Sequence, residues 1–148
     1  MADGHFEVTP TPLSLDAVVA RLTHPSVGAV STFVGIVRRD TDDRTTEHLD
    51  YEAYPDMAEQ QLRQIGEEIG ERWPGIRETA IVHRTGRLKP GEISVVIAVS
   101  AAHRRDVFAA THYAIDRLKE IVPIWKKEVW ANGEAWRTRG SEREETAT

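Results

Sequence analysis

The clearest candidate for chemistry is a cationic segment at residues 100–105 (SAAHRR), between an apolar run and a helical pattern. Ser100 can cap the helix that follows, which leaves backbone N–H groups directed outward from its first turn. The helix dipole adds partial positive charge, and His103 and Arg104 add cationic side chains. Such a helix start suits an anion, most naturally a phosphate. The alternative is an ordinary cap with solvated arginines, although cations at a helix N-terminus are unfavourable and need a reason.

Three lysines downstream are candidates for the same site. On a helical wheel of residues 101–121, Arg104 falls inside the apolar stripe and Lys119 falls on its edge. A lysine at such an edge either extends to solvent or faces a cleft, where a desolvated amine has a chemical role. Lys126 and Lys127 are adjacent on a predicted strand and point to opposite faces. Only one of them can therefore share a pocket with Lys119.

Charge is distributed unevenly along the 148 residues, of which 19 are basic and 24 acidic. Residues 103–127 carry a net charge of +3, and the remainder carries −8. A positive region on an acidic protein is typical of a site for a small anion or an acidic partner, whereas a net charge of −5 argues against extensive nucleic-acid binding. The absence of cysteine excludes disulfides, thiolate metal sites and a cysteine nucleophile.

Other patterns carry less chemistry. The remaining histidines follow no metal-ligand spacing, so we expect neither a metal nor a cofactor. His83 and Arg84, at the end of a predicted strand, are interpreted as a structural pair. The chain starts without a signal-peptide pattern and has no apolar stretch of the roughly 20 residues that a membrane helix needs. We therefore expect a cytoplasmic protein with no membrane or nucleic-acid partner.

The elements that must position these residues follow from apolar periodicity and turn residues. Helices are predicted at 15–22, 55–73 and 101–121. Strands are predicted at 5–9, 27–38 (buried), 48–54, 77–84, 92–100, 123–131 and 134–139, the last two joined at Asn132-Gly133. This order indicates a single-domain α+β fold over residues 1–148, with a mixed, mostly antiparallel sheet and flanking helices. Residues 140–148 are polar and are expected to form a disordered tail.

Six stretches carry a family resemblance, and they occur in the family's order over most of residues 27–137. The chain resembles the large, catalytic subunit of molybdopterin synthase in TFVGIVR (32–38), LDYEAYPDMAE (49–59), IVHRTGRLKPGE (81–92), VSAAHRRDVFAA (99–110), DRLKEIVPIWKKE (116–128) and Trp136. The resemblance implies a hammerhead-like α+β fold and a homodimer. A small ubiquitin-like sulfur-carrier subunit is then expected at each far end, which makes a heterotetramer.

The same resemblance implies a sulfurtransferase of molybdenum cofactor biosynthesis. The carrier's C-terminal Gly-Gly bears a thiocarboxylate, and two successive transfers convert cyclic pyranopterin monophosphate into the dithiolene of molybdopterin. An enzyme without cysteine must take its sulfur from elsewhere, and the thiocarboxylate supplies it. The substrate is flat and anionic, which suits a positively charged helix start.

The resemblance also assigns roles to individual residues. Lys119 is expected to lie at the carrier's C-terminus and to act in catalysis, through electrostatic stabilisation or proton transfer. Lys126 is expected to be the second catalytic residue. The substrate-binding set is expected to be Val37, Arg38, His103, Arg104, Lys119, Lys126, Lys127 and Glu128. Because the family's pocket lies near the dimer interface, some of these ligands are expected from the other protomer.

Two other functions are open on the residues alone. A non-catalytic, phosphate-binding dimeric module would use the same cationic helix start and would not need Lys119. An adaptor would bind a partner through its tryptophan-rich C-terminal hairpin and would bind no small molecule. The sequence leaves open the order of the two sulfur additions, the general acid or base, the cognate carrier, and whether Arg137 or Arg139 adds a cation.

Overall fold

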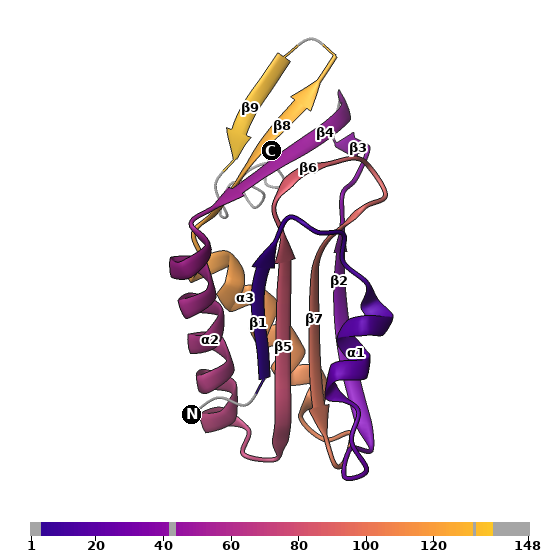
Figure 1. Cartoon of the computed structure of the whole chain (residues 1–148), viewed down its shortest axis with the longest axis vertical. Coiled ribbons are helices and arrows are strands. Elements are labelled where there is room, and N and C mark those ends of the chain that lie inside the picture. Colours follow the sequence, from indigo (N-terminus) through magenta and orange to yellow (C-terminus); the bar gives the residue numbers. More distant parts are fainter. Residues whose placement is uncertain (1–3, 42–43, 132, 138–148) are drawn as a thin grey trace.

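The computed structural model describes residues 4–41, 44–131 and 133–137, which form a helix-covered body and a smaller β-arm. The body contains α1 (Leu15–Leu22), α2 (Pro55–Arg72), α3 (Val107–Ile121) and, in sheet order, β1 (Gly4–Thr9), β5 (Ile76–Arg84), β7 (Ile93–Ala101) and β2 (Ala29–Ile36). The arm contains β3 (Asp40–Thr41), β4 (Arg44–Ala53), β8 (Ile124–Trp130) and β9 (Gly133–Arg137), with β6 (Gly86–Leu88) paired to β4. Figure 1 shows the arm rising from one end of the body.

The two faces of the body sheet bury different side chains because strand residues alternate between faces. On β5, Ile81 packs with α2 and α3 in the larger core cluster, whereas Ala80 and Val82 pack with α1 in a smaller one. The larger cluster also contains Leu118 near the end of α3 and Ile124 at the start of β8. This cluster therefore fixes the end of α3 against the base of the arm.

The arm is held together by β4, which pairs with β8 on one side and with β6 on the other. The β4–β8 register places Tyr51 opposite Lys126 and Leu49 opposite Glu128. Opposite residues of an antiparallel pair share a face, so these four side chains lie on one face of the arm. Lys127, between two of them, lies on the other face.

Local sequence explains how the helices begin. The Ser14 hydroxyl caps α1 by accepting a hydrogen bond from the Ala17 amide at 3.2 Å, as the sequence predicts. Pro55 occupies the first turn of α2, where no backbone donor is needed. The structure confirms the α+β class and the mostly antiparallel pairing, since only β1 and β5 pair in parallel among the described strands.

Two predictions about elements are wrong, and two short strands were not predicted. The helix predicted from residue 101 begins at Val107, because β7 continues to pair with both neighbours as far as Ala101. The strand predicted as buried at 27–38 is β2, an edge strand on which only Ser31 is buried. The short strands β3 and β6 were not predicted, because two or three residues are too few to show a period.

Some predictions cannot be compared with the structure. Asn132, at the predicted hairpin turn, and residues 138–148, which include Arg139 and the expected tail, lie outside the described residues. Among the described helices, none has the length and apolar character needed to cross a membrane.

Candidate active site

The cationic segment before α3 is an exposed turn rather than the first turn of a helix. His103, Arg104 and Arg105 are all exposed. The helix N-cap is Asp106, in the left-handed conformation at φ 71° and without a side-chain capping bond. Ser100 does not cap the helix, because it is fully buried within β7 and its hydroxyl donates to the Glu78 carbonyl at 3.5 Å. The predicted capped helix start, and the helical-wheel position of Arg104 that depended on it, are therefore wrong.

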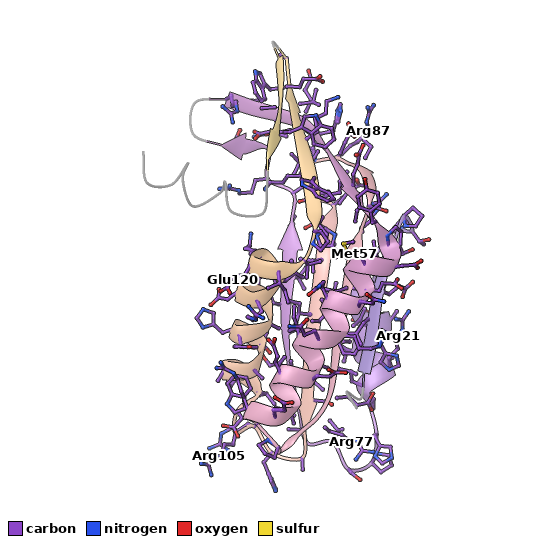
Figure 2. All side chains as sticks on the ribbon, turned by 90° about the vertical axis from the view of Figure 1, so that its left-hand side faces the viewer. Arg21, Met57, Arg77, Arg87, Arg105 and Glu120 are labelled. Carbon is purple, nitrogen blue, oxygen red and sulfur yellow. The ribbon has the colours of Figure 1, made fainter. Side chains whose placement is uncertain are left out.

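The predicted site residues divide between the two ends of α3. Figure 2 shows Arg105 at one end of this helix and Glu120, the neighbour of Lys119, at the other. Twelve residues of helix separate Val107 from Lys119, which corresponds to about 18 Å along the helix axis. Within one protomer, His103 and Arg104 therefore lie far from Lys119.

Lys119 and Lys126 come together at the junction of body and arm. Lys119 lies in the last turn of α3, and Lys126 follows seven residues later on β8. The positive charges of both lysines lower the pKa of the same buried side chain, His83. The β4–β8 register places Lys126 opposite Tyr51 and turns Lys127 to the other face of the arm. That Lys126 shares a pocket with Lys119 stays a prediction.

His83 is buried and neutral between these cations. Its side chain follows Ile81 on the face of β5 that α2 and α3 cover, and only 5% of its surface is exposed. Burial lowers the pKa of His83 from 6.5 to about 4; the carbonyl of Arg84 opposes this shift, and the charges of Lys119 and Lys126 add to it. At neutral pH the imidazole therefore carries no charge.

Tyr51 covers the His83 ring from the arm. The two rings meet edge to face with centroids 5.1 Å apart. The Tyr51 hydroxyl hydrogen-bonds to Ser94, whose own hydroxyl donates to the Gly35 carbonyl at 3.2 Å. Burial raises the pKa of Tyr51, so this phenol stays protonated at neutral pH. His83 and Tyr51 are thus both neutral at the junction of body and arm, where Lys119 and Lys126 carry positive charge.

Val37 and Arg38 extend this region from the end of β2. Val37 is 4% exposed and packs with Leu49, Leu88 and Tyr51. The Val37 amide donates to the Glu92 carbonyl at 3.0 Å, and the Val37 carbonyl accepts from the Gly91 amide at 2.9 Å. These bonds fix the backbone just before the exposed Arg38. Val37 is therefore placed to support the site through packing, while Arg38 reaches solvent. Their predicted roles in substrate binding stay predictions.

Glu128 shares a face of β8 with Lys126 but is engaged by the protein. Its carboxylate accepts from the Arg44 guanidinium at 3.3 Å through both oxygens and from the Thr46 hydroxyl at 2.9 Å. Arg44 also lies 4.3 Å from the centre of the Trp130 ring. These contacts tie β4 to β8 and hold the strand that carries Lys126. The predicted role of Glu128 beside the substrate stays a prediction.

Lys127 points to the opposite face of the arm, as its place on a strand predicts. Its ammonium group lies 3.1 Å from the Glu134 carboxylate and 5.8 Å from the centre of the Trp136 ring. Both partners belong to β9. The described contacts of Lys127 therefore stabilise the β8–β9 hairpin, and its predicted binding role stays a prediction.

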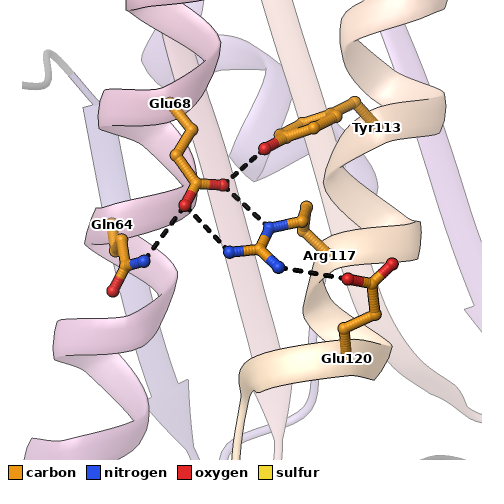
Figure 3. Close-up of polar contacts among 5 residues, drawn as sticks. All are labelled: Gln64, Glu68, Tyr113, Arg117 and Glu120. Carbon is orange, nitrogen blue, oxygen red and sulfur yellow. Dashed lines mark hydrogen bonds and ion pairs between the residues drawn. The ribbon is translucent and has the colours of Figure 1, made fainter.

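A polar clamp sets the position of α3 along α2 (Figure 3). Arg117 donates to both oxygens of the Glu68 carboxylate at 2.9 Å, and Tyr113 and Gln64 donate to the same carboxylate. A further bond of 3.1 Å joins Arg117 to Glu120. These bonds, led by that from Arg117, lower the pKa of Glu68 from 4.5 to about 2. On α3 the clamp residues run from Tyr113 to Glu120, so they lie on both sides of Lys119 in the sequence.

The sequence reasoning missed the role of His83 in bringing the site together. It interpreted His83 and Arg84 as a structural pair, and no spacing rule relates a histidine on one strand to lysines 36 and 43 residues later. The signal that could have found it is an ionisable residue on the apolar face of β5, where Ile81 precedes it. Among the described residues, no group of three acidic or histidine side chains could hold a metal ion.

Comparison with known proteins identifies the family. A family model described as MoaE protein matches residues 8–121. The chain belongs to the MoaE family. Curated relatives named molybdopterin synthase catalytic subunit share 52% identity in Halalkalibacterium halodurans, over 92% of this chain and 86% of the relative, and 50% in Bacillus subtilis, over 88% and 83%. The family resemblance predicted from the sequence is thus confirmed.

Solved structures of the MoaE family share the fold. The crystal structure of molybdopterin synthase from Staphylococcus aureus has a TM-score of 0.86 at 49% identity, and covers 89% of this chain and 96% of that one. Molybdopterin cofactor biosynthesis protein E from Burkholderia multivorans has a TM-score of 0.78 at 41% identity, covering 99% and 95%. The body and the arm are therefore features of the MoaE fold rather than of this chain alone.

Proposed function

We propose that this chain performs the sulfur transfer of a molybdopterin synthase catalytic subunit at the junction of body and arm, with Lys119 and Lys126 as its catalytic residues. The reaction moves sulfur from the C-terminal thiocarboxylate of a small ubiquitin-like carrier to cyclic pyranopterin monophosphate, and forms the dithiolene of molybdopterin. The observation that carries the residue assignment is that Lys119, in the last turn of α3, and Lys126, near the start of β8, follow Leu118 and Ile124, which pack in one core cluster at this junction.

The chemistry of the transfer explains why ammonium groups are needed. The thiocarboxylate sulfur forms a bond to a carbon of the substrate and displaces an oxygen substituent there, which gives a thioester between carrier and substrate. Water then attacks the thioester carbonyl, the carbon–sulfur bond of the carrier breaks with the sulfur left on the substrate, and the carrier leaves as a carboxylate. Negative charge develops on the carbonyl oxygen during this step, and a fixed ammonium group stabilises it. Lys119, in the last turn of a helix packed against α2, supplies such a fixed charge. Lys126 supplies the second from the arm.

The phosphate of the substrate needs cations in addition to the two lysines at the C-terminal end of α3. Arg38 lies after β2, and His103 and Arg104 lie on the turn before Val107, which is itself about 18 Å from Lys119 along α3. We assign His103 and Arg104 to the pocket of a second protomer, in a homodimer. Light scattering tests this dimer directly: a species of about 33 kDa, twice the 16.6 kDa of the chain, is expected. A monomer at working concentration would contradict the shared pocket.

The proposed assembly adds one sulfur carrier to each catalytic subunit, giving a heterotetramer. The proposed location is the cytoplasm, because the subunit must meet a diffusible substrate and a protein carrier in one aqueous compartment. Cell fractionation followed by immunoblotting checks the location. A membrane-bound or secreted pool would contradict it.

The experiment that tests the function is a single-turnover assay. The full-length chain is mixed with cyclic pyranopterin monophosphate and with a carrier whose terminus is either thiocarboxylate or carboxylate. Dithiolene product is expected with the thiocarboxylate carrier only. No product from a carrier that is active with another MoaE protein would overturn the proposal.

The two alternative functions are not favoured. A non-catalytic phosphate-binding module and a tryptophan-based adaptor both conflict with relatives of about 50% identity that are named as catalytic subunits. The alternatives also give no role to the lysine pair at the junction.

A further inference from the structure

We propose that two copies of this chain pair through the free edges of their β2 strands, antiparallel and about a twofold axis, to form the homodimer. This inference rests on the pocket that the proposed function shares between protomers. It goes beyond that function by naming the surface that joins the protomers and the direction in which the two strands run.

The two edges of the body sheet differ in their protection against a further strand. β1 and β2 are the edge strands, on opposite sides of the sheet (Figure 1). On β1, the Val8 amide donates to the Glu59 carboxylate of α2 at 2.9 Å, and Pro10 and Pro12 follow the strand. Charged side chains, prolines and covering elements are the means by which proteins protect sheet edges. The β1 edge is therefore protected.

The β2 edge has no charge or proline to protect it. Residues 26–37 contain neither a charged residue nor a proline. A bulge between Gly35 and Ile36 interrupts the register with β7 near one end, so the regular part of the strand is Ala29–Gly35. Among the described strands, only β7 pairs with β2. Because an edge strand directs alternate backbone N–H and C=O groups outward, this edge is a template for a second strand.

A second copy of the chain is the partner that this edge fits. A twofold interface brings each side chain near the axis close to its own copy, so a charged residue there would meet a like charge. β2 avoids this repulsion because it is uncharged. Its two exposed side chains are the neutral Thr32, in the middle of the regular part, and the apolar Ile36, at 56% exposure.

Antiparallel pairing brings together the two ends of the proposed site. β2 begins opposite Ala101 of β7, two residues before His103, and ends at Ile36, two residues before Arg38. The strand therefore runs from the level of the cationic turn to the junction of body and arm. Two antiparallel copies place the start of one β2 beside the end of the other. The cationic turn of one protomer thereby reaches the level of Arg38 and Lys119 in its partner.

An exposed aromatic side chain of α3 faces the same edge. α2 lies over β1 and β5, and α3 lies over β7 and β2. Tyr113 donates to Glu68 of α2, which marks the side of α3 that faces α2. Phe108 lies about 140° around the helix from Tyr113, so it points away from α2 and toward the side of β2. An axis perpendicular to the sheet keeps both α3 helices on one face, where each Phe108, 71% exposed in the protomer, packs against the partner.

Charge in the middle of β2 tests the surface. Antiparallel pairing over Ala29–Gly35 puts Thr32 opposite or diagonal to its own copy. Thr32→Lys and Thr32→Glu are each expected to raise the dissociation constant of the dimer about tenfold or more, through like-charge repulsion. An equimolar mixture of the two variants is expected to return to within about threefold of the wild type, because lysine then meets glutamate. Sedimentation velocity over a range of concentrations measures these constants.

Two further variants belong to the same measurement. Thr9→Lys, on the opposite edge of the sheet, is the matched control and is expected to leave the dimer unchanged. Phe108→Ala is expected to weaken the dimer about tenfold, because it removes an aromatic side chain that only the partner buries. Thermal unfolding checks that each variant is folded, and rescue in the mixture of the two Thr32 variants shows the same independently.

Crosslinking tests the direction of the strands, and the chain suits it because it contains no cysteine. Val30 and Val34 lie two residues before and after Thr32, on the same face of β2. In an antiparallel pair, Val30 of one copy lies near Val34 of the other. A mixture of Val30→Cys and Val34→Cys protomers is therefore expected to crosslink with a short bis-maleimide, and each variant alone is expected to crosslink far less.

Three results would overturn the proposal: wild-type dimer affinity in both Thr32 variants, a mixture of these variants that stays dissociated, or crosslinking of each cysteine variant with itself but not of the mixture. A mixture that fails to crosslink would overturn it as well. All of these measurements are made without substrate or carrier. A wild-type dimer that pairs as expected but transfers no sulfur would overturn the proposed function instead, so the two failures are distinguishable.

Discussion

The two ends of α3 carry cations in opposite settings. At its start, His103, Arg104 and Arg105 are exposed on a turn whose last residue, Asp106, has a positive φ. At its end, Lys119 is partly buried, and its charge and that of Lys126 both lower the pKa of the buried His83. Exposed cations suit the capture of a mobile anion, whereas cations fixed in a packed junction suit the stabilisation of charge that develops during a reaction.

This difference teaches that one helix can serve two sites, or two halves of one site in a dimer. The distance of about 18 Å between the ends prevents both sets from contacting one small substrate in the same protomer. A twofold axis that brings the start of one α3 to the end of another removes this obstacle.

The largest effect is expected from Lys119→Ala at the end of the helix. Loss of one fixed charge that stabilises the reacting carbonyl costs about 10²- to 10³-fold in rate. The single-turnover assay measures this loss, and isothermal calorimetry with the carrier checks that binding is retained. Lys89→Ala, an exposed turn lysine on the same end of the body, is the control and is expected to be neutral. A Lys119→Ala rate within threefold of the wild type would show that the end of the helix does not carry the catalytic charge.

A smaller effect, on affinity rather than on rate, is expected from Arg104→Ala at the start of the helix. One hydrogen bond to a charged group contributes about 1.5–3 kcal/mol, so the substrate is expected to bind about ten- to a hundredfold more weakly. The rate at saturating substrate is expected to change little.

Arg105→Ala is the matched control for this substitution, because the Arg105 side chain is 91% exposed and only approaches Asp106, at 4.0 Å. Titration of the substrate into each variant measures the affinities. Equal losses in the two variants would mean that the helix start acts through its general charge and not through Arg104.

The smallest effect is expected in the middle of the helix, from Glu68→Gln on α2. The substitution weakens the clamp on Arg117 and is expected to lower the free energy of unfolding by about 1 kcal/mol. Urea unfolding at neutral pH measures this difference, with the exposed Glu67→Gln as control. Sulfur transfer is expected to stay unchanged, because the clamp holds α3 without touching the reaction.

The clamp also predicts an acid dependence of stability. The folded-state pKa of Glu68 is lowered from 4.5 to about 2, so the contribution of its carboxylate is complete above pH 4.5. It is lost as the pH falls from about 4.5 to about 2, where the folded protein must also take up the proton. Glu68→Gln is therefore expected to be closer to the wild type in stability at pH 2.5 than at pH 7. A difference that stays constant with pH would show that the carboxylate charge is not what stabilises the clamp.

Much of the body could be predicted from the sequence because its signals are local. Ser14 and Pro55 mark helix starts, Gly91 has the positive φ of its turn, and alternation identifies β4. The start of α3 could not be predicted, because the register of β7 with its two neighbours is a tertiary feature that overrides helix propensity at residues 101–106. Phe108, on the predicted apolar stripe, lies in the first turn of α3 and is 71% exposed.

The site was predictable in its residue types but not in its arrangement. The helical period predicts that Lys119 lies at the edge of the apolar stripe. The alternation of side chains along a strand predicts that Lys126 and Lys127 point to opposite faces. The junction with His83 does not, since it depends on β5 and α3 ending at the same level and on Tyr51 covering the ring from the arm. The cations divide between the two ends of α3 because the helix begins at Val107, which the sequence did not predict.

The most direct test of a pocket shared between protomers is a mixed dimer. One protomer carries Lys119→Ala and the other carries Arg104→Ala, and two affinity tags isolate the species that contains one of each. If the start of one α3 completes the site at the end of the other, one of the two pockets is intact, and about half of the wild-type rate is expected at substrate concentrations well below the wild-type Kd. Activity no higher than that of the two parent variants would show that each pocket is built from a single protomer, and would contradict the account.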